Sequence, residues 1–122
     1  MSQKDKDADS ELVSQVQDYR DHQIAYASSV EHLKQSFRES DEDNLSTIAD
    51  QYYQLTKDHY QILLSFKEKT LPQMIAFYLR YGEKDMANEQ EEFFKTEKMV
   101  LEKKLLDFEN DQNQGKIPKW IN

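Results

Sequence analysis

Apolar residues in the first third of the chain recur at alternating steps of three and four. The row consists of Leu12, Val16, Tyr19, Tyr26, Val30, Leu33 and Phe37, with polar Gln23 in its one interrupted position. An average step of about 3.5 residues keeps every member on one stripe of an α-helix. The sequence therefore predicts a long amphipathic helix from about residue 10 to residue 40, with Ser10 as its N-cap and one face packed lengthwise against other helices.

The same spacing returns after a polar link at residues 38–44. The second row consists of Leu45, Ile48, Tyr52, Leu55, His59, Ile62 and Phe66. Asp43 or Asn44 is a suitable cap for this helix, because both residue types accept hydrogen bonds from a first helical turn. Two matched apolar rows joined by a short link predict an antiparallel helical hairpin.

Pro72 interrupts the second helix, since proline lacks the amide hydrogen and crowds the preceding turn. Thr70 and Gln73 have the spacing of a capping box, which predicts a kink or restart over residues 69–72. Gly82 stands where a left-handed residue would end the restarted helix. A further helix is expected from Asp85 to about residue 110, because acidic residues precede lysines in the direction that the helix dipole favours.

These elements predict an all-α fold, an elongated antiparallel three-helix bundle or coiled coil whose second helix is kinked or restarted near Pro72. Only two glycines and two prolines occur in 122 residues, too few for the many tight turns of a sandwich or barrel. The expected organisation is a flexible leader at 1–9, a helical bundle domain at 10–110 and a C-terminal tail at 111–122.

Composition narrows the classes of partner. A net charge of −8 disfavours direct binding to nucleic acid and to anionic membranes, which both attract lysine and arginine. No run of about 18 apolar residues is present to span a membrane, and the charged N-terminus differs from a signal peptide. The absence of cysteine excludes disulfides and thiolate metal sites and fits a reducing compartment. A cytoplasmic location is the resulting expectation.

The sequence predicts no catalytic, cofactor or metal site. It lacks a Gly-x-Ser-x-Gly elbow, a glycine-rich phosphate loop and the Glu-x-x-His pairs of bundle di-iron centres. Asp18 and His22 can share a helical face, but two ligands do not make a metal site. His59 occupies a position in the second apolar row, where an interhelical hydrogen bond is the ordinary role. We therefore do not expect an enzyme.

Candidate partner-binding residues come from two regions. Tyr53 and Tyr60 share a stripe beside the second apolar row, and they are predicted either to pack in the core or to line a second interface. The tail carries Ile117, Trp120 and Ile121. A tail of this kind covers an open end of the bundle, inserts its tryptophan into a partner as an aromatic anchor, or stays disordered.

The resulting functional hypothesis is a non-enzymatic helical protein–protein interaction module, an adaptor or complex subunit that binds another protein or associates with itself. The alternative is an acidic inhibitor or decoy that occupies the basic nucleic-acid-binding surface of a target, motivated by the acidic stretches at 39–43 and 83–92. A curved membrane scaffold is less favoured, because such a surface needs more basic residues than the lysines at 95–104 supply.

Overall fold

The computed structural model describes residues 3–39 and 42–113, with side chains over 9–39 and 45–111. Within these ranges the chain forms four α-helices and no strand: α1 (Gln3–Glu39), α2 (Glu42–Lys69), α3 (Leu71–Arg80) and α4 (Lys84–Asn113). The predicted all-α class is confirmed. None of these four helices is long and apolar enough to cross a membrane.

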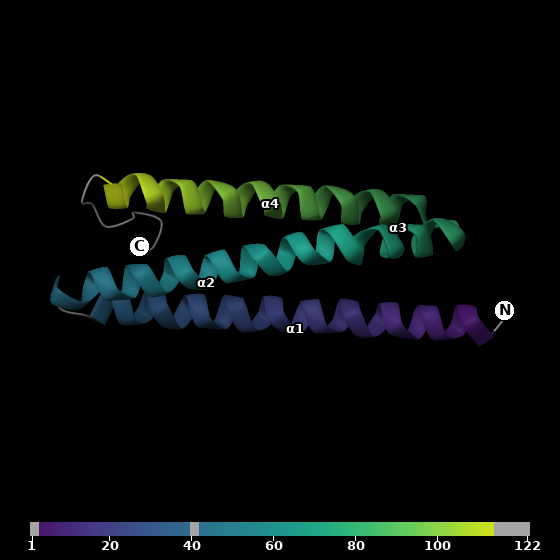
Figure 1. Cartoon of the computed structure of the whole chain (residues 1–122), viewed down its shortest axis with the longest axis horizontal. Helices are drawn as coiled ribbons and strands as arrows, with labels where there is room; N and C mark the ends of the chain where they lie inside the picture. Colours follow the sequence, from purple (N-terminus) through teal and green to yellow (C-terminus); the bar gives the residue numbers. More distant parts are fainter. Residues whose placement is uncertain (1–2, 40–41, 114–122) are drawn as a thin grey trace.

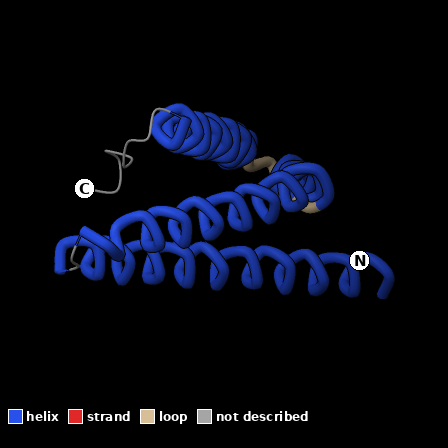
Figure 2. The backbone as a smooth tube through the Cα atoms, turned by 60° about the vertical axis from the view of Figure 1, so that its left-hand side comes forward, coloured by secondary structure: helices blue, strands red, loops and turns tan. Residues whose placement is uncertain are grey.

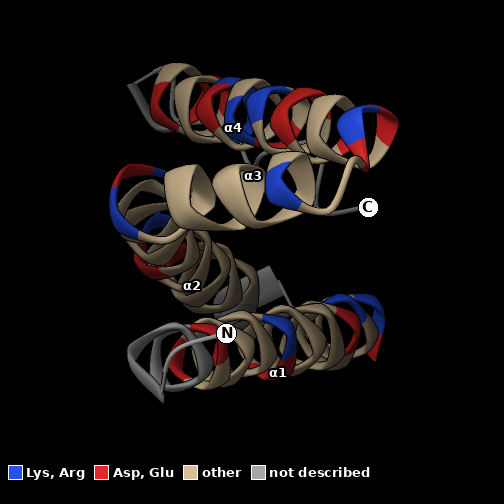
Figure 3. Ribbon diagram, turned by 90° about the vertical axis from the view of Figure 1, so that its right-hand side faces the viewer, with Lys and Arg blue, Asp and Glu red and all other residues tan. Residues whose placement is uncertain are grey.

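The long helices lie side by side, with α2 between α1 and α4 (Figure 1). The views in Figures 2 and 3 show the same order, with short α3 placed beside the first turns of α4. Contacts join α2 to both α1 and α4, and α3 packs mainly on α4. Because α1 and α4 both run opposite to α2, the first and last helices are parallel to each other (Figure 1).

The position of α2 between two neighbours widens its buried face beyond the row that the sequence predicts. Four members of that row are buried: Ile48, Tyr52, His59 and Phe66. Ala49, Thr56 and Leu63, which lie beside the row, are also buried, whereas Leu55 and Ile62 are only half-buried. A helix covered on two sides buries residues on both contact faces and between them, which explains the wider face.

Two apolar clusters divide the core along the molecule. The larger cluster joins all four helices and includes Leu12, Tyr19, Leu63, Phe66, Leu71, Met74, Phe94 and Leu101. The smaller cluster joins α1, α2 and α4 through Val30, Ala49, Tyr52 and Phe108. Along α2, the buried polar residues Thr56 and His59 fall between the two clusters. The helices are therefore held at two apolar regions separated by a polar one.

The passage from α2 to α3 occurs at Thr70, and Pro72 lies in the first turn of α3. Helical backbone hydrogen bonds continue on either side of Thr70. The Thr70 amide donates to the Phe66 carbonyl (2.8 Å), and the Met74 amide donates to the Thr70 carbonyl (3.0 Å). The predicted capping box is wrong, because the Thr70 side chain makes no capping bond. Its hydroxyl donates instead to Gln15 Oε1 on α1, at 3.2 Å.

Helix boundaries depart from the sequence prediction at several ends. The N-cap predicted at Ser10 is wrong, because α1 begins at Gln3. The second helix begins at Glu42, ahead of the predicted cap residues, and α4 extends from Lys84 to Asn113. Lysine, glutamate and glutamine at these ends have good helix propensity, and aspartates near a helix N-terminus interact favourably with the dipole, so the helices run past the apolar rows that marked them. The domain boundaries remain a prediction.

Gly82 ends α3 in the left-handed conformation that the sequence predicts, with φ of 75°. The Gly82 amide donates to the Leu79 carbonyl (3.1 Å), and the Glu83 amide donates to the Tyr78 carbonyl (2.8 Å). This pair of bonds is a Schellman motif, which satisfies the last carbonyls of a helix and turns the chain. The motif sets the direction in which α4 returns along the molecule.

Substituting Gly82→Ala is expected to lower the free energy of unfolding by about 1–2 kcal/mol. The added Cβ would meet no atom within 4 Å, so the cost comes from the left-handed backbone alone. Gly82→Asn should cost less, because asparagine tolerates this conformation. Urea unfolding followed by circular dichroism measures both effects, and an alanine variant as stable as the unchanged chain would contradict the expectation.

Candidate functional site

Three side-chain hydrogen bonds join α1 to α2 and to Thr70, the residue between α2 and α3. Beside the bond between Thr70 and Gln15, the Tyr26 hydroxyl lies 3.0 Å from Thr56 Oγ1, and His22 Nδ1 lies 3.2 Å from His59 Nδ1. The three bonds follow one another in antiparallel order along α1 and along the segment from α2 to Thr70. Polar pairs inside an apolar contact fix the axial register of two helices, since a shift would leave them unpaired.

The His22–His59 pair is the most unusual of these contacts. A hydrogen bond between two Nδ1 atoms requires one ring nitrogen to carry hydrogen and the other to accept it. The two rings lie nearly parallel, at an interplanar angle of 3° and a centroid distance of 5.3 Å. Tyr26 stacks on His59 with a centroid distance of 4.2 Å. The pair is thus held among aromatic rings and loses its hydrogen bond if both Nδ1 atoms become donors.

Burial, chiefly, together with the charges of His22 and Lys104 lowers the pKa of His59 to about 4. Only 4% of the His59 surface is exposed. Burial disfavours the charged imidazolium, and neighbouring cations add to that effect. His59 is therefore a neutral hydrogen-bonding group at neutral pH, which agrees with its expected role between helices.

The structure brings no metal-binding group together in the described part of the chain. No three histidine, cysteine or carboxylate side chains in this part of the chain are grouped so that they could hold a metal ion. Asp18 and His22 do share a face, since both line a shallow depression between α1 and α2. Asp18, His22 and His59 together do not form a metal-binding site.

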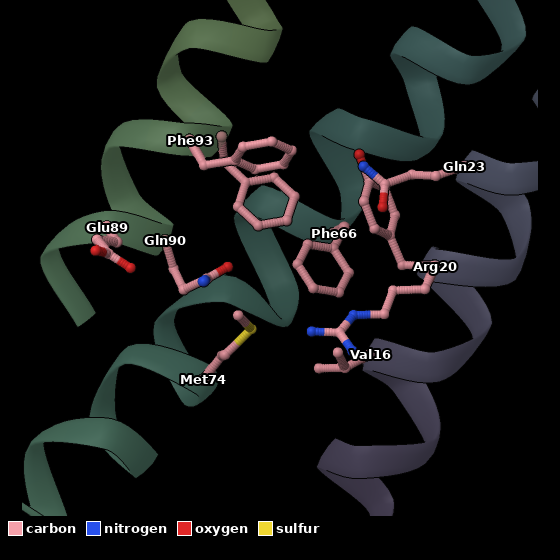
Figure 4. Close-up of a pocket in the computed structure, with 10 residues that line it drawn as sticks. Val16, Arg20, Gln23, Phe66, Met74, Glu89, Gln90 and Phe93 are labelled. Atoms are coloured by element: carbon pink, nitrogen blue, oxygen red, sulfur yellow. The ribbon is translucent and has the colours of Figure 1, made fainter. Parts of the chain in front are cut away.

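A cleft of about 360 Å³ opens between α1 and α4, beside the passage from α2 to α3. We call it the aromatic cleft; it is lined by Val16, Tyr19, Arg20, Gln23, Phe66, Met74, Glu89, Gln90, Phe93 and Phe94. Figure 4 draws Arg20 and Gln90 reaching into the opening from opposite helices. Phe66 and Phe94 form its floor with ring centroids 4.9 Å apart, and Tyr19 stacks on Phe66 at 4.4 Å.

Tyr19 places a buried hydroxyl beside this cleft. The hydroxyl makes no hydrogen bond of ordinary geometry to a described residue. Burial chiefly raises the pKa of Tyr19, Glu97 raises it further, and the nearby Gln23 amide offsets part of the rise. The phenol is therefore protonated at neutral pH and retains a donor without a good acceptor. A buried polar atom left in this way costs about 1–3 kcal/mol.

Arg20 supplies the positive charge of the cleft. Among the described side chains it has no salt bridge, whereas Arg80 pairs with Asp9 and Lys98 pairs with Glu102. The cleft thus combines aromatic walls, one cation without a counter-ion and one buried donor. Such a combination suits a ligand that has both an apolar part and an acceptor.

The predicted partner-binding tyrosines contact α4 within the chain. Tyr53 donates to Glu109 Oε1 at 2.7 Å and stacks on Phe108 with a centroid distance of 4.3 Å. Tyr60 is half-buried against the larger apolar cluster. Burial raises the pKa of Tyr60, and the charge of Glu102 on α4 raises it further. The second stripe of α2 therefore serves the α2–α4 contact. Ile117, Trp120 and Ile121 lie outside the described residues, and their role remains a prediction.

Sequence reasoning did not select Arg20, Gln23 or Tyr19 as site residues. One signal was present, because Gln23 interrupts the first apolar row at the position that faces the cleft. A polar residue in an apolar row indicates either an interhelical hydrogen bond or a solvated opening, and periodicity cannot separate the two. Thr56, which is fully buried, had no signal because the predicted row passed through Leu55.

Apolar side chains also remain exposed along α4. Met86, Phe93 and Val100 follow one another at intervals of seven residues, and Met99 and Leu106 form a second pair at the same interval. Met99 is 63% exposed and Leu106 is 56% exposed. The narrow row formed by Ala87, Phe94, Leu101 and Phe108 is the face of α4 that is buried.

No protein-family model matches this chain, and comparisons with curated proteins and with solved structures found no match.

Proposed function

We propose that the chain is a non-enzymatic helical protein–protein interaction module, a cytoplasmic adaptor or complex subunit that binds another protein or a second copy of itself. In this proposal α1, α2 and α4 act as an elongated antiparallel three-helix bundle, bent where α2 passes into α3 before Pro72. Lengthwise helices present long faces for docking and few enclosed sites for chemistry.

The observation that carries the proposal is the apolar surface of α4. Its two exposed rows, Met86 with Phe93 and Val100, and Met99 with Leu106, run along the helix at heptad spacing. Scattered apolar residues on a surface are ordinary, but rows at heptad spacing have the geometry that a partner helix requires. Burial of such rows yields about 25 cal/mol per Å² of apolar surface, which favours association.

Site-specific photocrosslinking in the native host tests this function. A benzophenone amino acid at Val100 is expected to give one dominant crosslinked product, because this position faces the partner. The matched control carries the same group at Gln61, an exposed position of α2 outside the α4 rows. A dominant product of twice the mass of the chain identifies self-association. Equal, diffuse crosslinking from both positions would contradict the proposed docking face.

No observation favours the acidic decoy. Glu39, at the end of α1, and the acidic start of α4 lie at opposite ends of the molecule (Figure 1). A mimic of nucleic acid needs its carboxylates arranged on one continuous face. The remaining residues of the first acidic stretch, 40–43, have no described side chains. The decoy stays an alternative prediction.

A further inference from the structure

We propose that the aromatic cleft is a binding site for a small amphipathic carboxylate. The apolar part of the ligand lies against Phe66, Phe93 and Met74, and its carboxylate is held by Arg20. This site is separate from the rows of α4 that carry the proposed docking function, except that Phe93 borders both. Binding of a small molecule and association with a partner can therefore be measured independently.

The walls of the cleft favour an apolar ligand. Aromatic rings from α1, α2 and α4 and the thioether of Met74 on α3 line a space of about 360 Å³. This volume lies within the usual range of small-molecule sites, roughly 300–1,000 Å³. Phe93 is 46% exposed, although its ring packs edge-on against the ring of Phe94 with a centroid distance of 5.3 Å. A ligand chain in the cleft would cover the exposed side of this ring and gain the free energy of apolar burial.

The polar groups of the cleft favour a carboxylate. An ionised carboxylate is an acceptor on both oxygens, and the guanidinium of Arg20 offers donors in a matching planar arrangement. The side-chain amides of Gln23 and Gln90 supply further donors around the same space. Glu89 is the one acidic residue that lines the cleft, and it lies on α4, across the opening from Arg20 (Figure 4).

The net charge of the chain acts against the capture of anions over long distances. At −8 the whole molecule repels an anion, but charges on exposed residues are screened beyond about 10 Å at 0.1 M salt. The local charges are those of Arg20, which attracts the carboxylate, and of Glu89, which lies across the opening and opposes it. Burial of the apolar chain must supply the rest, which explains why a small inorganic anion is not the proposed ligand.

Octanoate, followed by ¹H–¹⁵N correlation spectra, is the probe that tests this site. We expect saturable shifts at millimolar concentrations, centred on the residues that line the cleft, and weaker binding of octanol, which lacks the charge. Arg20→Gln should weaken octanoate binding about tenfold and leave octanol binding unchanged. The matched control is Arg38→Gln, which alters an exposed arginine of α1 outside the cleft.

Tyr19→Phe provides a control that leaves the charge of the cleft in place. Octanoate binding should stay close to that of the unchanged chain, because the Tyr19 hydroxyl is buried and has no surface in the cleft. The melting temperature should stay equal or rise, because the removed hydroxyl has no good partner in the folded chain. Octanoate binding that is absent, spread over the whole surface, or equally strong in the Arg20→Gln variant would overturn the proposal.

Discussion

Replacing Phe66 by alanine is expected to lower the free energy of unfolding by about 3–5 kcal/mol. Phe66 is 7% exposed and stacks on Tyr19 of α1 and on Phe94 of α4. Its removal therefore takes contacts from three helices at once and leaves a space that the adjoining cleft extends. Because a domain of this size has a total stability of about 5–15 kcal/mol, the variant should unfold at a much lower urea concentration.

Phe93→Ala is the matched control, with the same chemical change on the exposed side of α4. It should cost about 1 kcal/mol, because nearly half of the Phe93 surface is already in contact with water. Phe66→Leu keeps an apolar side chain at the junction and provides a milder variant if Phe66→Ala does not fold. Urea midpoints that fall equally for Phe66→Ala and Phe93→Ala would show that the stacked rings do not join the helices.

Acidification from pH 6.5 to about pH 4 should destabilise the fold through His59. The pKa of this residue is lowered from 6.5 to about 4 in the folded chain. Below pH 6.5 the unfolded chain takes up a proton at His59 that the folded chain does not, so stability falls with pH until the folded form also titrates. A pKa difference of this size lowers the free energy of unfolding by on the order of 3 kcal/mol between pH 6.5 and pH 4.

His59→Phe separates this effect from the titration of carboxylates. The variant keeps an aromatic ring beside Tyr26 but has no proton to gain, so its stability should depend less steeply on pH between 6.5 and 4. It should also be less stable at pH 7, since His22 loses its hydrogen-bond partner. His32→Asn, at an exposed histidine of α1, should leave the slope close to that of the unchanged chain. Identical slopes for His59→Phe and the unchanged chain would refute the assignment.

The apolar rows were sufficient to predict helices, because a repeat of about 3.5 residues leaves one continuous stripe on an α-helix and no stripe on a strand. The left-handed Gly82 was also predictable, since few other residues accept that conformation. Helix ends were less predictable. Ser10 and Thr70 had suitable chemistry for capping, but α1 starts earlier and the Thr70 hydroxyl bonds to Gln15 on another helix.

Residues of the candidate sites were only partly predictable. His59 was expected to bond between helices, but its partner His22 lies 37 positions earlier in the chain, and only the pairing of α1 with α2 selects it. The aromatic cleft depends on all four helices meeting near Phe66. Tyr53 was predicted either to pack internally or to line an interface, and the position of α4 placed it in contact with Phe108.

The sequence by itself determined that this chain forms long amphipathic helices, because side-chain periodicity is a local property of the backbone. The tertiary structure decided which residues on those helices are buried. Since α2 lies between α1 and α4, its most buried row runs through Thr56 and Leu63, beside the predicted Leu55 and Ile62. Since α4 is covered along one row, it keeps Phe93 and Met99 exposed. Burial depends on the number and direction of neighbouring helices, and that information is not contained in the spacing of residues along one of them.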